Sequence, residues 1–154
     1  MRDDSARGPY LLGRGVEVLG ALLVGAALWL IAASPAVIGW IAALVGVSLF
    51  VMGRWQSLRA WEHLPALRRT SPEPGWLTVL AGGVSIAAVA AGAVVGAAYG
   101  PLSAVIAVML GAAGMYFGYR NLQADPKGAE RVMSAVLLVA GVGVATLAIQ
   151  ALLF

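Results

Sequence analysis

The sequence contains no cysteine and a single histidine, His63. Without cysteine the chain has no disulfide, no thiolate nucleophile and no cysteine-ligated metal. One histidine beside one glutamate supplies too few ligands for a metal ion, and no partner nucleophile accompanies His63 as a general base. We therefore interpret His63 as an interfacial side chain, with a pH-sensing role as the alternative. We expect no cofactor and no metal.

Charged residues are also scarce. They make up 11% of the chain, whereas hydrophobic residues make up 61%. A soluble domain is typically about 25% charged and about 45–50% apolar, and a soluble core of this length cannot bury such an excess. The net charge of +3 is small and forms no basic stripe, so we expect no nucleic acid partner. The composition predicts a single-domain integral membrane protein surrounded by a lipid bilayer.

The sequence contains five uninterrupted apolar runs. Apolar and polar residues do not alternate in them with the period of two that is typical of a strand. The runs cover residues 16–33, 36–52, 76–99, 102–119 and 132–154. About 20 helical residues cross a hydrocarbon core about 30 Å thick, and helices satisfy their own backbone groups there. The runs predict an all-α, polytopic transmembrane bundle of five helices, arranged as two tandem helical hairpins plus a C-terminal helix. It would comprise an N-terminal segment, 1–15, and one transmembrane domain, 16–154, with a cytoplasmic loop at 53–75.

Two pairs of runs are joined by very short connections, Ser34-Pro35 and Gly100-Pro101. Proline suits the first turn of a helix, where its missing N–H costs nothing. Ser34 can cap the helix that Pro35 opens, and Gly100 can supply the left-handed residue that ends the preceding helix. Both connections therefore predict tight antiparallel hairpins.

All ten lysines and arginines lie before the first run, between the second and third, or between the fourth and fifth. A five-helix chain places these three segments on one side of the membrane, and the positive-inside bias makes that side cytoplasmic. We expect a plasma (inner) membrane protein with its N-terminus in the cytoplasm and its C-terminus outside. The first run is longer than the 7–15-residue core of a signal peptide, so we expect it to be retained.

Glycines recur at helical spacing inside the runs. Those we expect at helix contacts are Gly39, Gly46, Gly53, Gly92, Gly96, Gly100, Gly111, Gly114 and Gly118. Small residues let helix backbones approach closely in lipid. We interpret them as packing within the bundle. The alternative is a seam between copies of the chain, or a contact with a larger membrane complex.

The two proline-initiated runs share a further pattern: Gly46 and Gly53 after Pro35 match Gly111 and Gly118 after Pro101. The pattern fits an internal repeat, and it also fits chance similarity between apolar segments. With Gly20–Gly25, Ser34-Pro35 and Gly39, these residues make the chain resemble the HdeD-type family of small bacterial membrane proteins. The resemblance implies a helical bundle linked to acid stress, without a defined enzymatic activity. That family usually has six crossings, whereas this chain has five.

Glu17 is the ionisable residue that lies furthest inside an apolar run, and Arg14 precedes it by three residues. That spacing allows an ion pair on one helix face, and a carboxylate near a helix N-terminus is favourable. We interpret Arg14 and Glu17 as a structural pair. The alternative is a carboxylate at the inner mouth of a proton or cation path. Residues 53–64 either continue the second helix or lie along the membrane surface, and the alternative is a solvated connector.

No serine–histidine pair, aspartate pair or metal-ligand set lies within the runs. We therefore expect a protein without enzymatic activity, acting as an accessory or stress-related helical bundle. The alternative is a small oligomeric transporter or channel for a proton, an ion or a small solute, which the glycine-rich helices favour and the lack of polar residues at mid-membrane disfavours.

Overall fold

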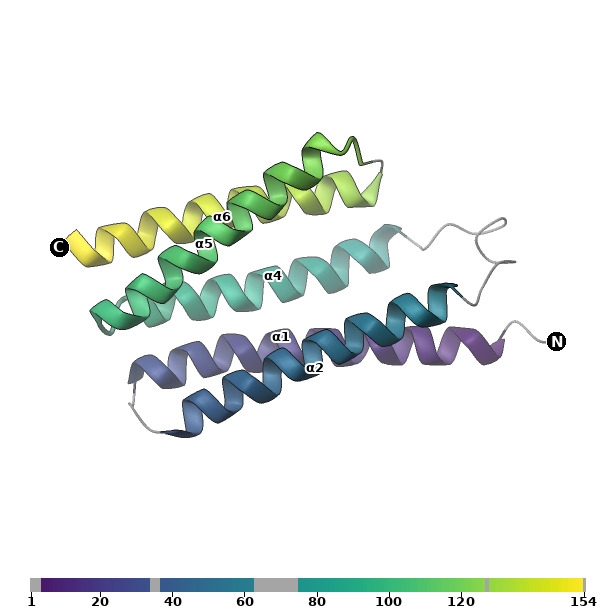
Figure 1. The fold of residues 1–154 in the computed structure, drawn as a ribbon, viewed down its shortest axis with the longest axis horizontal. Helices are drawn as coiled ribbons and strands as arrows, with labels where there is room; N and C mark the ends of the chain where they lie inside the picture. Colours follow the sequence, from purple (N-terminus) through teal and green to yellow (C-terminus); the bar gives the residue numbers. More distant parts are fainter. Residues whose placement is uncertain (1–3, 34–36, 63–74, 127, 154) are drawn as a thin grey trace.

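The structure is a computed structural model that describes residues 4–33, 37–62, 75–126 and 128–153. These residues form five α-helices and no strand: α1 (Asp4–Ala33), α2 (Val37–Glu62), α4 (Gly75–Ala97), α5 (Pro101–Gln123) and α6 (Ala129–Leu153) (Figure 1). Each of the five contains a stretch long and apolar enough to cross a membrane. The predicted all-α transmembrane bundle is confirmed, and the chain is a multi-pass membrane protein.

Several helices extend beyond the apolar runs that predicted them. α1 begins at Asp4, before residue 16, and contains Pro9. α2 continues to Glu62, so residues 53–62 prolong the second helix and do not belong to a loop. Backbone hydrogen bonds carry a helix into polar sequence, whereas hydropathy marks only its apolar part. His63 and Ser34-Pro35 lie outside the described residues.

Three helices run in one direction and two in the other. α1, α4 and α6 are parallel, with α4 in the middle, and α2 and α5 run antiparallel to them (Figure 1). α1 packs mainly on α2 and α4, and α6 packs mainly on α5 and α4. α2 and α5 make no contact with each other within the described helices. In the view of Figure 1, α2 lies in front of α1, and α5 lies in front of α4 and α6, so both antiparallel helices stand on one face of the parallel row without meeting.

Glycine backbones bring α1 and α2 together. A Cβ on Gly20 would overlap the backbone of Gly46 and Phe50, and a Cβ on Gly53 would overlap the backbone of Gly13 and Glu17. Because no side chain separates the helices at these points, their backbones are in van der Waals contact. This tight contact fixes which α2 residues face Glu17.

A similar contact joins α5 and α6. A Cβ on Gly111 would lie 2.7 Å from the backbone nitrogen of Ala145, and one on Gly118 would lie 2.7 Å from that of Leu138. A Cβ on Gly141 of α6 would lie 2.6 Å from the backbone nitrogen of Met115. The glycines of α5 therefore pack on α6, the helix that follows, although α5 is joined to α4 by the Gly100-Pro101 connection.

Other predicted glycines lie at weaker or different contacts. Gly92 of α4 meets the backbone of Gly25 in α1, and a Cβ on Gly96 would lie 3.2 Å from the carbonyl oxygen of Leu28. A Cβ on Gly114 would lie 3.3 Å from the Cα of Gly141. Gly39 faces the side chain and backbone of Ile31. These contacts join α4 to α1, α5 to α6 and α2 to α1, respectively.

Gly100 corrects two expectations, because it is neither left-handed nor at a helix contact. α4 ends earlier, at Ala97, and the Tyr99 N–H donates to the Gly96 carbonyl oxygen at 3.0 Å. Gly100 has φ 169° and ψ 163°, an extended backbone, and a Cβ there would meet nothing within 4 Å. Pro101 explains the difference, since its ring drives the preceding residue towards extended conformations. Gly100 is the N-cap residue of α5.

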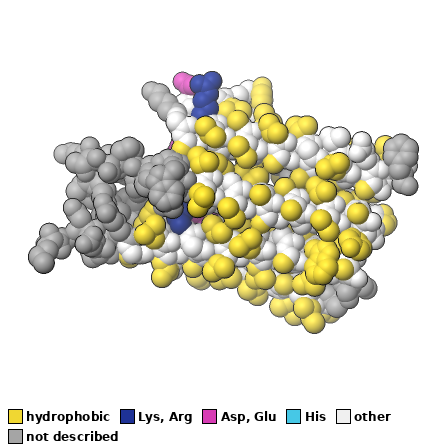
Figure 2. All heavy atoms as spheres, turned by 180° about the vertical axis from the view of Figure 1, so that it is seen from behind, with side chains coloured by type: hydrophobic (Ala, Val, Ile, Leu, Met, Phe, Trp, Pro, Cys, Tyr) yellow, Lys and Arg dark blue, Asp and Glu magenta, His cyan; other side chains and the backbone are white. Residues whose placement is uncertain are grey.

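The interior is built from small side chains. Its main cluster lies among α4, α5 and α6 and consists of Ala93, Ala97, Ala104, Ala107, Val144 and Ala148. Large hydrophobic side chains such as Val139 and Leu153 are exposed, and apolar side chains are spread over the described part of the face drawn in Figure 2. This distribution is the one expected when lipid surrounds the helices and close backbone contact holds them together.

Candidate functional site

A chamber of about 700 Å³, lined by charged, polar and apolar residues, opens at the end of the bundle where α1, α4 and α6 begin. All five helices contribute to its lining. Its charged residues are Arg14 and Glu17 from α1, Arg54 from α2 and Glu130 from α6. We call this end the basic end, since Arg14, Arg54, Arg120 and Arg131 all lie towards it in their helices. The chamber is the place in the described bundle where charge reaches the interior.

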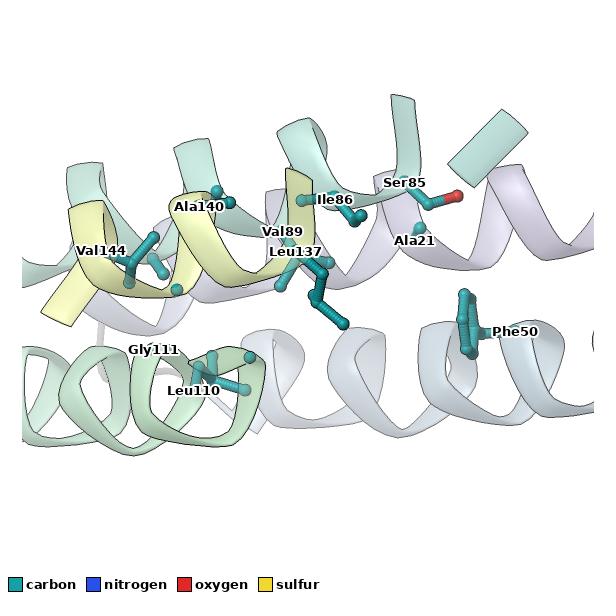
Figure 3. A pocket seen from close by; sticks show the side chains of 14 residues that line it. Ala21, Phe50, Ser85, Ile86, Val89, Leu110, Gly111, Leu137, Ala140 and Val144 are labelled. Carbon is teal, nitrogen blue, oxygen red and sulfur yellow. The ribbon is translucent and has the colours of Figure 1, made fainter. Parts of the chain in front are cut away.

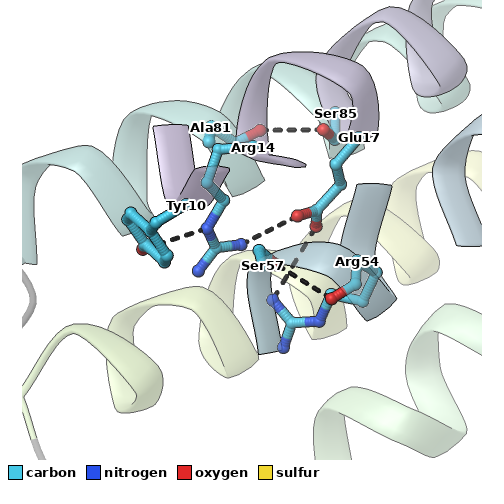
Figure 4. A network of polar contacts seen from close by, with 7 residues as sticks. All are labelled: Tyr10, Arg14, Glu17, Arg54, Ser57, Ala81 and Ser85. Atoms are coloured by element: carbon cyan, nitrogen blue, oxygen red, sulfur yellow. Dashed lines mark hydrogen bonds and ion pairs between the residues drawn. The ribbon is translucent and has the colours of Figure 1, made fainter. Parts of the chain in front are cut away.

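Arg14 and Glu17 form the ion pair that their spacing predicts (Figure 4). Arg14 Nη1 donates to Glu17 Oε2 at 2.9 Å, and Arg14 Nε donates to the Tyr10 hydroxyl at 3.2 Å. Arg14 is 8% exposed and Glu17 is 5% exposed. The pair is thus buried within the helix contacts, where removing one partner would leave an uncompensated charge. The buried ion pair gives both Arg14 and Glu17 a structural role.

Arg54 adds a second cation that spacing along one helix does not reveal. Its Nη1 lies 3.8 Å from Glu17 Oε1, so the carboxylate stands between two guanidinium groups (Figure 4). The contact follows from Gly53, whose missing side chain lets α2 approach the backbone of Glu17. The sequence contained one signal for this contact, because Arg54 directly follows Gly53, a glycine expected at a helix contact. Arg14, Glu17 and Arg54 form what we call the charge triad.

Three serines line the chamber, and each uses its hydroxyl proton within its own helix. Ser57, Ser85 and Ser134 donate to the backbone carbonyl oxygens of Arg54, Ala81 and Glu130, each at 2.8 Å. Such back-bonding is common for hydroxyls in apolar helices. A serine nucleophile needs its proton directed to a base, so these hydroxyls are not arranged for catalysis.

Next to the chamber lies an apolar cavity of about 200 Å³ (Figure 3). Its lining comes from all five helices and contains Phe50 of α2 and Leu110 of α5 on opposite flanks. The two hollows share Phe50, Ser85, Ile86 and Leu137. They are therefore neighbouring parts of one depression, polar at the basic end and apolar at depth. We call the whole depression the trough.

The remaining predicted site residues do not join the triad. Gly111 and Gly114 line the apolar cavity, while Gly39, Gly46 and Gly53 lie at the α1–α2 contact. His63 lies outside the described residues. Among the residues that the structure describes, no group of three histidine, aspartate or glutamate side chains could hold a metal ion.

Comparison with known proteins adds no relative: no protein-family model, curated protein or solved structure matches the chain. The resemblance to the HdeD-type family consequently stays a prediction.

Proposed function

We propose that this chain is a non-enzymatic membrane protein that binds an amphiphilic molecule in the trough. The observation that carries the proposal is the junction of the two hollows at Phe50, Ser85, Ile86 and Leu137. A polar head fits the chamber of about 700 Å³, and an apolar chain fits the adjoining cavity of about 200 Å³. Binding sites between bundle helices commonly combine an apolar lining with a few polar groups.

The absence of a contact between α2 and α5 supports entry from the bilayer. A molecule that reaches the trough from the side does not have to cross the bundle. The positive-inside bias favours a cytoplasmic basic end in the plasma membrane, so the ligand would come from the inner leaflet. In this proposal the bundle serves as a lipid-binding accessory protein.

A transporter or channel remains the second candidate, and the observation that favours it is Glu17, a buried carboxylate that lines an open polar chamber. Against a path through one copy, the apolar cavity beyond Ser85 is lined by alanine, glycine, valine, leucine, isoleucine and phenylalanine. A permeating ion needs polar groups that replace its water, and these residues offer none in their side chains.

The binding proposal is testable with a monoacylglycerol that carries a photoreactive group in its acyl chain. Its uncharged head makes labelling independent of the triad. In liposomes containing the full chain, we expect saturable labelling of the trough residues, mapped by mass spectrometry. Ala140→Phe fills the apolar cavity and should remove most of that labelling. Val139→Phe is the matched control, because Val139 is 71% exposed on the same helix.

Even labelling of all lipid-facing residues, with no effect of Ala140→Phe, would show that the trough holds no particular molecule. The same liposomes discriminate the second candidate. A proton or cation flux that depends on Glu17 and is insensitive to Ala140→Phe would favour transport over binding.

A further inference from the structure

The charge triad presents the exposed guanidinium of Arg54 to the chamber. Two guanidinium groups face one carboxylate, with Arg14 at 2.9 Å from Glu17 and Arg54 at 3.8 Å. Arg14 and Glu17 form the close, buried pair, so the guanidinium that faces the chamber from an exposed side chain is that of Arg54.

Arg54 is the member of the triad that an incoming molecule can reach. Its side chain is 48% exposed and lines the chamber. Its contact with Glu17 is longer than a hydrogen bond, and a guanidinium has five N–H donors in a planar fork. The side chain therefore keeps donors for a further acceptor. The oxygens of a phosphate match the fork with two parallel hydrogen bonds.

The triad also lies at a depth suited to a lipid headgroup. Arg14 extends back along α1 to the hydroxyl of Tyr10, towards the basic end. Arg54 directly precedes Trp55, which is 52% exposed. Tyrosine and tryptophan favour the level of the headgroups, and long basic side chains direct their charge to that level.

The apolar cavity distinguishes a lipid from a free anion. It follows α4 from Ser85 to Ala93, a length of about 12 Å at 1.5 Å per residue. Free phosphate has nothing to place there, whereas one acyl chain of a phospholipid would displace no hydrogen-bonded water from an apolar lining. Glu130 of α6 also lines the chamber; it is exposed, as Arg54 is, so solvent screens both charges.

Building on the proposed binding function, we infer that the trough is a site for an anionic phospholipid of the leaflet at the basic end. The phosphodiester accepts hydrogen bonds from Arg54 and pairs with its positive charge. One acyl chain occupies the apolar cavity. Glu17 holds the two arginines in place and is not itself a ligand contact.

The experiment compares two phospholipids that carry the same photoreactive acyl chain, phosphatidylglycerol and phosphatidylcholine. Each is added at trace level to phosphatidylcholine liposomes containing the full chain. We expect phosphatidylglycerol to label the trough about fivefold more, because both lipids carry the phosphodiester but only phosphatidylglycerol keeps a net negative charge beside Arg54. Arg54→Gln should remove this preference. Arg120→Gln, which removes an equal charge at the same end but does not line the chamber, should preserve it.

Labelling by the neutral monoacylglycerol distinguishes a failure of the phospholipid inference from a failure of the proposed binding function. If it still labels the trough of Arg54→Gln, the variant is folded and the loss of preference belongs to Arg54. Equal labelling by the two phospholipids of the unmodified protein overturns the inference while the binding function stands. Displacement of phosphatidylglycerol by millimolar inorganic phosphate also overturns it, because the ligand would then be a free anion. Absence of labelling by all three probes removes the proposed function itself.

Discussion

At the scale of single residues, the missing side chain of glycine determines which residues of α1 and α2 meet more than any charge does. Gly53 lets α2 approach the backbone of Glu17, and this approach places Arg54 beside the carboxylate. The spacing of Gly46 and Gly53 predicted a packing stripe, and Arg14 and Glu17 were predictable as a pair from their separation of three. Arg54 was not predictable as their partner, because only the contact between two helices brings it there.

Two alanine substitutions should have different effects on stability. Gly53→Ala places a Cβ against the backbone of Glu17 and Gly13 and should lower the free energy of unfolding by about 1–3 kcal/mol, the usual cost of overpacking. Gly143→Ala meets nothing within 4 Å and should be neutral or stabilising by up to about 1 kcal/mol, because alanine is the better helix former. Circular dichroism during denaturant titration in mixed micelles measures both. Equal effects of the two substitutions would contradict the contact.

At the scale of helices, the bounds of each helix and the neighbour on which it packs differ from what hydropathy indicates. The first apolar run begins at residue 16, yet α1 begins at Asp4 and runs through Pro9. The matched glycines of the repeat pattern have different partners as well: Gly46 and Gly53 pack on α1, which precedes α2, whereas Gly111 and Gly118 pack on α6, which follows α5. Local sequence carries the glycine spacing, but it does not carry the identity of the facing helix.

Cysteine pairs test the pairing of α5 with α6 cleanly, because the chain has no cysteine of its own. Gly111→Cys with Ala145→Cys should form a disulfide under a membrane-permeant oxidant, since their Cβ atoms would lie 2.9 Å apart. The helices must separate slightly to reach the usual Cβ separation of about 3.5–4.5 Å. The matched control pairs Gly111→Cys with Gly143→Cys, since a Cβ on Gly143 would meet nothing within 4 Å. Electrophoretic mobility reports disulfide formation in both cysteine pairs. Cross-linking of the control pair alone would contradict the packing of α5 on α6.

At the scale of the whole molecule, the bundle buries alanine and glycine and turns its large apolar side chains outward. Such a surface requires lipid. The composition predicted this environment, and the five apolar helices agree with it. The orientation follows from a different argument, the location of all basic residues between alternate helices, and it stays a prediction.

Reporter fusions measure that orientation. A reporter that is active only outside the cytoplasm should be active after Phe154, and one that is active only inside should be active before Met1. The reason is that an odd number of crossings separates the two ends. Fusions at the connection near Gly100 should behave like those at Phe154. Activity of a cytoplasmic reporter after Phe154 would mean an even number of crossings.

The sequence by itself determined the solvent, the helical class and the number of apolar helices, because each depends on composition and on run length along one chain. It also determined the Arg14–Glu17 pair, which one helix contains. Only the tertiary structure decided that α5 packs on α6, that Arg54 completes the triad and that α2 and α5 leave a trough between them. These features depend on which backbones meet across space, and in a bundle held by glycine and alanine many apolar faces offer nearly equal contacts.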